Sequence, residues 1–80
     1  MKFANKETIK EIAPAITNQT AMLFECIISN FNIESQRQKQ DGFLFFLGMR
    51  DALEAQGIIT PQQSAELREY AFSFMKGGEN

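Results

Sequence analysis

The 80-residue sequence contains no histidine, no tryptophan and no valine, and it has a single cysteine. Without histidine the chain lacks the commonest general base and the commonest metal-ligating side chain. One cysteine excludes an internal disulfide, and with it the class of small secreted domains that disulfides stabilise. The only paired glycines, Gly77 and Gly78, follow a predicted helix instead of opening one as a phosphate-binding loop does. We therefore expect no enzymatic activity, no cofactor and no metal ion.

Positive charge and long apolar runs are also scarce. The chain carries 8 basic and 10 acidic residues, for a net charge of −2. Nucleic-acid-binding domains usually have a basic excess, because neutralising phosphates supplies most of their non-specific affinity. The longest nearly unbroken apolar run, residues 43–49, is far shorter than the roughly 20 residues of a membrane-spanning helix. Charged residues also occupy the N-terminal stretch where a signal peptide is apolar. These features predict a cytoplasmic protein that binds neither membrane nor nucleic acid.

Phenylalanine, by contrast, is abundant, with 8 residues in a chain that is 44% hydrophobic. A chain of this length forms one domain, residues 1–80, in which we expect 1–5 and 77–80 to be frayed tails. Such a small core rarely contributes more than about 3–5 kcal/mol, so small domains often gain stability from a disulfide, a metal or a partner chain. Because the first two are not provided for, we expect some apolar surface to be buried against a second copy of the chain or another protein.

Apolar residues recur at helical spacing from Lys6 to Phe31, and Asn5 is suited to cap the start of this segment. Pro14 lies inside the segment, where it removes a backbone hydrogen bond and disfavours helix at Ala13. The apolar stripe nevertheless keeps its phase across the proline. The pattern predicts either one kinked helix or a short helix followed by a second one starting at Pro14. The stripe consists of Ile9, Ile12, Ala13, Ile16, Thr20, Leu23, Phe24, Ile27 and Phe31.

A second helix is predicted to end near Gln56. The polar stretch 34–41 before it is either a solvated loop or the exposed beginning of the helix, and Ser35 as a possible cap favours the helix. An alternative hairpin would pair residues 26–33 with 43–48, but the helical stripe already explains the apolar residues of the first strand. The buried face of the helix is predicted to contain Phe45, Phe46, Met49, Ala52 and Leu53, and the polar face Arg50, Asp51 and Glu54.

A helix stop and a helix start follow each other between residues 57 and 63. Gly57 suits the left-handed position after a helix, and Thr60 suits an N-cap. Pro61 fits the first helical position, and Gln63 completes a capping box. The last helix then runs to about Lys76 with a buried face of Leu67, Tyr70, Ala71, Phe74 and Met75. The predicted fold is therefore all-α: a small bundle of three long helices, or four if Pro14 breaks the first, ending in a helical hairpin.

Few side chains in the sequence indicate a catalytic or metal-binding role. Cys26 has no histidine partner and lies beside the apolar stripe, so we expect a small buried or half-buried residue and not a nucleophile. Glu7 with Glu11 and Glu66 with Glu69 have a spacing that can hold a metal or share a proton. Basic residues lie near both pairs, however, and solvated charge explains them equally well.

The apolar residues outside the predicted core faces are the most informative about function. Phe43, Leu44 and Leu47 lie outside the main face of their helix, and Phe72 lies outside the face of the last one. They are covered either by their own chain or by a partner. The small size of the domain favours a partner, so we expect these four residues to form a protein interface. The chain would then act as an adaptor, inhibitor or regulator, with a homodimer as one form.

The alternative is a small transcriptional regulator that contacts DNA through the hairpin of residues 48–76. The glycine in its turn is typical of a helix-turn-helix, and Gln62 and Gln63 near the start of the last helix could contact adenine. Only one basic residue, Arg68, lies in the part of that helix that would face DNA. The protein-binding hypothesis is therefore preferred.

Overall fold

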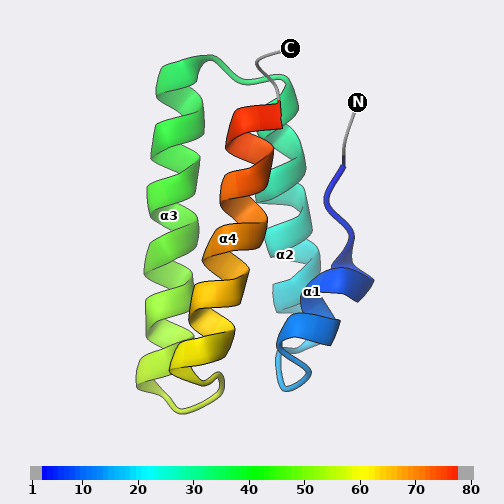
Figure 1. The fold of residues 1–80 in the computed structure, drawn as a ribbon, viewed down its shortest axis with the longest axis vertical. Helices are drawn as coiled ribbons and strands as arrows, with labels where there is room; N and C mark the ends of the chain where they lie inside the picture. Colours follow the sequence, from blue (N-terminus) through cyan, green and yellow to red (C-terminus); the bar gives the residue numbers. More distant parts are fainter. Residues whose placement is uncertain (1–2, 78–80) are drawn as a thin grey trace.

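The computed structural model describes residues 3–77, and every regular element in this range is a helix. The all-α prediction is confirmed, and the hairpin of residues 26–33 with 43–48 is wrong. Figure 1 shows α2, α3 and α4 side by side, with α1 lying against α2 and α4. The helices are α1 (Lys6–Ile12), α2 (Asn18–Ser29), α3 (Gln36–Ala55) and α4 (Pro61–Gly77), and the 3₁₀ turn η1 (Asn30–Asn32) extends α2.

Pro14 breaks the first segment into two helices. α1 ends at Ile12, and residues 13–16 form a turn before α2 begins at Asn18. Thr17 is the N-cap of α2, since its hydroxyl oxygen accepts a hydrogen bond from the Thr20 N–H at 3.1 Å. The predicted single kinked helix is therefore wrong, and so is a second helix starting at Pro14. Proline has no N–H to donate, and the chain uses the next available capping residue to restart.

The break also resets which residues face the core. Ile9, on one side of the turn, and Ile16, at its far end, are both buried, as predicted. In α2, Phe24 is buried as predicted, but Ala21 and Ile28, which the stripe did not include, are buried as well. Leu23, which the continuous stripe placed inside, is 43% exposed. The turn rotates α2 relative to the phase that one unbroken helix would have.

The N-terminal segment is attached to the bundle by side chains of α2 and α4. Three successive backbone N–H groups donate to side-chain oxygens, and Ala4 is buried. Residues 4 and 5 of the expected N-terminal tail are therefore held in place, and Gly77, expected in the C-terminal tail, is instead the last residue of α4, while residues 1–2 and 78–80 lie outside the described residues. The three hydrogen bonds run from Ala4 N–H to Ser29 Oγ (3.1 Å), from Asn5 N–H to the Tyr70 hydroxyl (3.0 Å) and from Lys6 N–H to Glu25 Oε2 (2.9 Å).

The polar stretch 34–41 forms the beginning of α3, as predicted. Ser35 is the N-cap, and its hydroxyl accepts a hydrogen bond from the Gln38 N–H at 3.3 Å. The Gln38 side chain accepts in return from the Ser35 N–H at 2.9 Å. This reciprocal capping box satisfies two backbone donors that would otherwise lack a partner. The helix then continues to Ala55, next to the predicted end.

The buried face of α3 differs from the predicted one. Phe46 is fully buried, but Phe45 is 59% exposed and Ala52 is also exposed. Phe43 and Leu47, predicted to lie outside the face, are half-buried and pack against the core. The inward side of the helix also includes two cationic residues that the sequence analysis had placed in solvent.

Lys39 and Arg50 are those two residues. Lys39 is only 6% exposed, and the Arg50 side chain is 15% exposed. Long basic side chains bury their methylene groups while the charged end finds polar partners. The Arg50 guanidinium pairs with Asp51 Oδ1 at 2.7 Å and donates to the Ser64 carbonyl oxygen of α4 at 3.4 Å. Arg50 therefore connects α3 to α4 from a position that the sequence pattern assigned to solvent.

The turn between α3 and α4 has the predicted geometry. Gly57 has a positive φ of 77°, and its N–H donates to the Glu54 carbonyl oxygen at 2.9 Å. The Ile58 N–H donates to the Leu53 carbonyl oxygen at 3.0 Å, which completes a Schellman motif. α4 then begins at Pro61 behind the Thr60 cap, with the capping box formed by Gln63. The predicted roles of all four turn residues, Gly57, Thr60, Pro61 and Gln63, are confirmed.

Removing the Thr60 cap should lower the free energy of unfolding by about 1 kcal/mol. The Thr60→Ala variant loses the hydroxyl that accepts from the Gln63 N–H at 3.1 Å. Thr60→Ser keeps that acceptor and should remain within a few tenths of a kcal/mol of the parent. Urea unfolding followed by circular dichroism measures both. Equal losses in the two variants would mean that the hydroxyl does not cap α4.

Aromatic rings join the helices at the centre of the bundle. The Phe24 ring of α2 meets the Phe46 ring of α3 edge to face, with centroids 4.8 Å apart. Phe31, Leu67 and Phe74 are also among the large side chains buried in the core. Leu67 and Phe74 belong to the face of α4 that the sequence predicted. None of the helices within residues 3–77 combines the length and apolar character needed to cross a membrane.

Candidate protein interface

Two of the four predicted interface residues, Phe43 and Phe72, lie where α3 and α4 meet. α3 supplies Phe43, Leu44 and Leu47, and α4 supplies Phe72. The two helices are joined here by the rings of Phe43 and Phe72, whose centroids are 5.9 Å apart. We call these four residues the α3–α4 patch.

The α3–α4 patch has a half-buried base and an exposed edge. Phe43 and Leu47 pack against the core, and the Phe43 ring also stacks on Phe46 with centroids 6.4 Å apart. Leu44 is 64% exposed, and Phe72 is 38% exposed. The base is therefore held in place by the fold itself, while the edge leaves apolar area in solvent.

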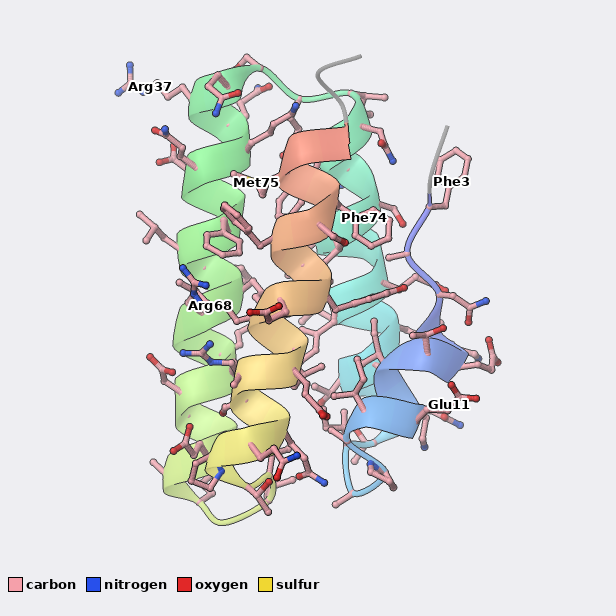
Figure 2. The ribbon with its side chains drawn as sticks, in the orientation of Figure 1. Phe3, Glu11, Arg37, Arg68, Phe74 and Met75 are labelled. Atoms are coloured by element: carbon pink, nitrogen blue, oxygen red, sulfur yellow. The ribbon has the colours of Figure 1, made fainter. Side chains whose placement is uncertain are left out.

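Arg68 belongs to the same surface, although sequence reasoning did not include it. Its guanidinium carbon lies 5.9 Å from the centre of the Phe43 ring and 5.6 Å from that of Phe72. Figure 2 shows Arg68 where α3 and α4 adjoin. Arg68 forms no salt bridge with any side chain that the structure describes. The signal was present in the sequence, because residues four apart on a helix are neighbours and Arg68 precedes Phe72 by one turn.

Other exposed apolar side chains lie outside the α3–α4 patch. Phe45 follows Leu44 in the chain, but successive helical residues point about 100° apart, so its ring leaves on another side of α3. Leu23 on α2 is 43% exposed. Phe43 and Phe72 of the patch form ring contacts with each other and contacts with the Arg68 cation, whereas no such contact is found for Phe45 or Leu23 among the described residues. They are useful controls for the patch.

The α3–α4 hairpin does not have the geometry of a DNA-reading motif. The two helices run alongside each other in Figure 1, whereas a helix-turn-helix crosses at about 90–120°. Gln63 uses its side-chain oxygen to accept from the Thr60 N–H and is thereby engaged in the cap. The next exposed side chains along α4 include Glu66 and Glu69, whose charge opposes phosphate.

The other candidate residues of the sequence are exposed. Cys26 is an exposed free thiol, which corrects the expectation of a buried or half-buried residue and follows from the rotation of α2. Glu7, Glu11, Glu66 and Glu69 are all exposed as well. No group of three or more acidic, cysteine or histidine side chains within the described range is arranged to hold a metal ion. The fold does bring Glu11 of α1 to the same groove as Glu66 and Glu69 of α4.

Comparisons with protein-family models, with curated proteins and with solved structures find no match for this chain.

Proposed function

We propose that this protein is a small protein-binding module, an adaptor, inhibitor or regulator, that acts through the α3–α4 patch. The observation that carries the proposal is the arrangement of Leu44 and Phe72 over a base already packed into the core, with the Arg68 guanidinium above the rings. Aromatic residues and arginine are enriched at the centres of protein interfaces. Side chains that are already ordered lose little conformational entropy when a partner binds.

The chemistry of the α3–α4 patch defines what a partner must offer. Covering Leu44 and Phe72 requires an apolar side chain, and burying their remaining exposed area contributes on the order of 2–3 kcal/mol. Arg68 forms no salt bridge among the described residues, so its guanidinium can donate charge-assisted hydrogen bonds to an acidic group of a partner. A partner that presents an apolar residue beside a carboxylate therefore fits both features.

A second copy of the chain meets both requirements, so we propose a homodimer as the form that this surface supports. Asp51 lies on the same flank of α3, one turn after Leu47, and its side chain is 63% exposed. The two hydrogen bonds that Asp51 accepts from Arg50 both go to Oδ1, which leaves Oδ2 for another donor. In a two-fold arrangement each Arg68 would meet Asp51 of the other copy, while the two α3–α4 patches cover each other.

Replacing the exposed edge of the α3–α4 patch should separate the dimer without unfolding the monomer. The variant is Leu44→Ser with Phe72→Ser, measured by sedimentation equilibrium and by the helical circular dichroism signal. Phe43 and Leu47 are unsuited to this test, because they also support the core. We expect the mass to fall to that of one chain, with helicity and a cooperative melt retained.

A matched control removes the same kind of exposed side chain elsewhere, through Phe45→Ser with Leu23→Ser. This variant should remain a dimer. If the wild type is a monomer at millimolar concentration, or if both double variants dissociate alike, the homodimer through the α3–α4 patch is wrong. Steeply salt-dependent binding of duplex DNA by the wild type would instead favour the transcriptional regulator.

The proposed ion pair allows a charge-exchange test. Arg68→Glu and Asp51→Arg should each weaken dimerisation, because each places like charges together across the interface. An equimolar mixture of the two single variants should form a heterodimer, since both of its cross-interface pairs then have opposite charges, one pair native and the other reversed. Native mass spectrometry measures the species in the mixture. Failure of the mixture to associate would exclude this pairing while leaving the apolar contact to be judged by the serine variants.

A further inference from the structure

Residues 3–12, which comprise the N-terminal segment and α1, are attached to the bundle through α2 and α4. Among the described helices, α1 packs against these two and contacts neither α3 nor η1. The three hydrogen bonds of the N-terminal segment also end on side chains of α2 and α4. We call residues 3–12 the arm, and the surface of α2 and α4 that it covers the seat.

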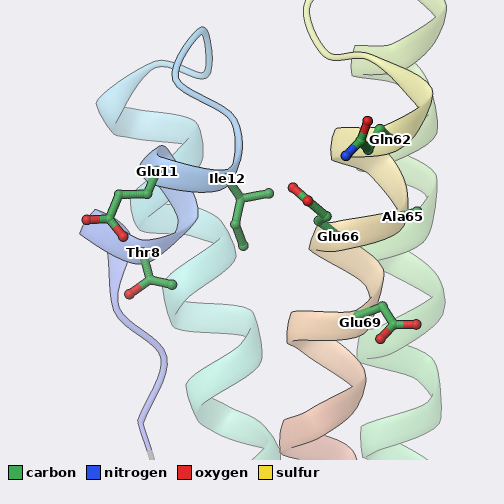
Figure 3. Close-up of a pocket in the computed structure, with 7 residues that line it drawn as sticks. All are labelled: Thr8, Glu11, Ile12, Gln62, Ala65, Glu66 and Glu69. Carbon is green, nitrogen blue, oxygen red and sulfur yellow. The ribbon is translucent and has the colours of Figure 1, made fainter.

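The arm is held less firmly than the rest of the bundle. Ala4 and Ile9 are its buried side chains, and Phe3 is 63% exposed. Between α1 and α4 the packing leaves a groove of about 620 Å³, and Ile12 on its α1 wall is half-buried (Figure 3). A segment with few buried apolar contacts opens at a lower free energy than the core. The arm can therefore leave its seat while α2, α3 and α4 stay folded.

The turn of residues 13–17 provides a hinge between the arm and α2. Its two ends are not helical, since Ala13 has φ −136° and ψ 80° and Thr17 has φ −68° and ψ 159°. One backbone hydrogen bond spans the turn within the described residues, from the Ile16 N–H to the Ala13 carbonyl oxygen at 3.1 Å. Ala13 and Ile16 are also buried. An open arm therefore exposes apolar surface that a second copy can cover again.

We propose that the seat binds the arm of a second copy, so that two chains exchange residues 3–12. The site and its ligand are both present in one chain, and every contact of the arm with the seat can be made by the same arm from another copy. Five extended hinge residues span at most about 17 Å, so the two copies must meet at the end of the bundle where the turn lies (Figure 1).

The exchange is independent of the homodimer proposed above, because the α3–α4 patch lies on the flank of α4 that faces α3. A tethered arm has an effective concentration in the millimolar range or above. The closed monomer therefore prevails in dilute solution, and exchange requires concentrated protein and time for the arm to leave its seat.

The experiment looks for a disulfide between two chains that exchange alone brings together. One chain carries Ala4→Cys and the other Ser29→Cys, at positions joined by a hydrogen bond of 3.1 Å. Both also carry Cys26→Ser, Leu44→Ser and Phe72→Ser, which remove the native thiol and the exposed edge of the patch. The chains are mixed at about 1 mM just below their melting temperature and then cooled. Glutathione disulfide takes up the two electrons and two protons that the thiols lose as they join.

We expect a covalent dimer, twice the mass of one chain, in the mixture and not in either chain alone. A single chain with both Ala4→Cys and Ser29→Cys should instead close its disulfide within the monomer, which controls for the distance between the two positions. If that chain closes but the mixture gives no covalent dimer, the arm is not exchanged. Equal amounts of dimer in the mixture and in the separate chains would show random collision and overturn the proposal.

A change in the hinge tests the same proposal without cysteines. Pro14→Ala with Thr17→Ala removes the helix-breaking proline and the cap of α2. Residues 6–29 then favour one helix of about 36 Å, whose arm cannot reach its own seat. With the patch edge replaced by serines, this variant should form a dimer and keep its helicity.

The matched control lengthens the hinge by about five glycine and serine residues after Ala15, which eases closure within one chain and should leave a monomer. Sedimentation equilibrium measures both hinge variants. A monomeric Pro14→Ala Thr17→Ala chain, or a dimer of the long-hinge control as well, would overturn arm exchange and leave the α3–α4 patch to be judged by its own variants.

Discussion

Phe46→Ala is expected to lower the free energy of unfolding by about 3–5 kcal/mol, the loss typical of a buried ring that leaves a cavity. Phe46 is fully buried and lies where three helices meet. Its ring contacts Phe24 of α2 edge to face at 4.8 Å and stacks on Phe43 at 6.4 Å. A domain of this size has a total stability of about 3–5 kcal/mol from its core. A large fraction of the variant should therefore be unfolded at room temperature.

The preceding residue supplies a matched control for this experiment. Phe45 has the same side chain in the same helix but is 59% exposed, so Phe45→Ala should change the free energy of unfolding by less than about 1 kcal/mol. Urea unfolding of both variants, with the wild type, measures the difference. Similar losses for the two substitutions would show that α3 does not have the rotation described above.

Phe45 and Phe46 also show what the sequence analysis could not determine. Residues 43–47 are all apolar, so they point in every direction around α3 and do not indicate which side is buried. The inward side of α3 also holds Lys39 and Arg50, which the pattern treated as solvent-facing. Arg50 is half-buried because the Ser64 carbonyl oxygen and Asp51 both receive its hydrogen bonds. Ser64 lies on another helix, and such a contact is not visible in the periodicity of α3 alone.

Helix caps were predicted more successfully than buried helix faces, because a cap and the residue it bonds to are close in the chain. The Ser35 and Thr60 caps each bond to a residue three positions later, and both were predicted. Thr17 makes the same kind of cap for α2 and was missed. The apolar stripe that continued across Pro14 favoured one helix, and the capping residue just beyond the proline was the better guide.

The α3–α4 patch and the groove between α1 and α4 also differ in how far the sequence could predict them. The α3–α4 patch was predicted because its residues stood outside the expected helix faces, although two of them also support the core. The groove between α1 and α4 was not predicted, because its two walls meet only when α1 packs against α4. Spacing along the sequence indicates neighbours on one helix, while a groove between two helices requires the tertiary fold.

The second large effect concerns the turn that joins α3 to α4. Gly57→Val is expected to lower the free energy of unfolding by about 2 kcal/mol or more, because a β-branched residue resists a positive φ. Gly57 has a φ of 77°. If valine forces the backbone out of this conformation, the hydrogen bonds from the Gly57 and Ile58 N–H groups to the end of α3 are lost as well.

Two comparisons isolate the backbone as the cause. A Cβ at Gly57 would meet no heavy atom within 4 Å, so the added Cβ itself makes no clash and the positive φ is the source of the expected loss. A Cβ at Gly48 also meets nothing within 4 Å, but Gly48 lies inside α3 with an ordinary helical φ, so Gly48→Val should be nearly neutral. Gly57→Asn should lose less than Gly57→Val, since asparagine tolerates a left-handed backbone. Denaturant unfolding should rank the variants in that order, and a neutral Gly57→Val would mean that α3 ends in a different turn.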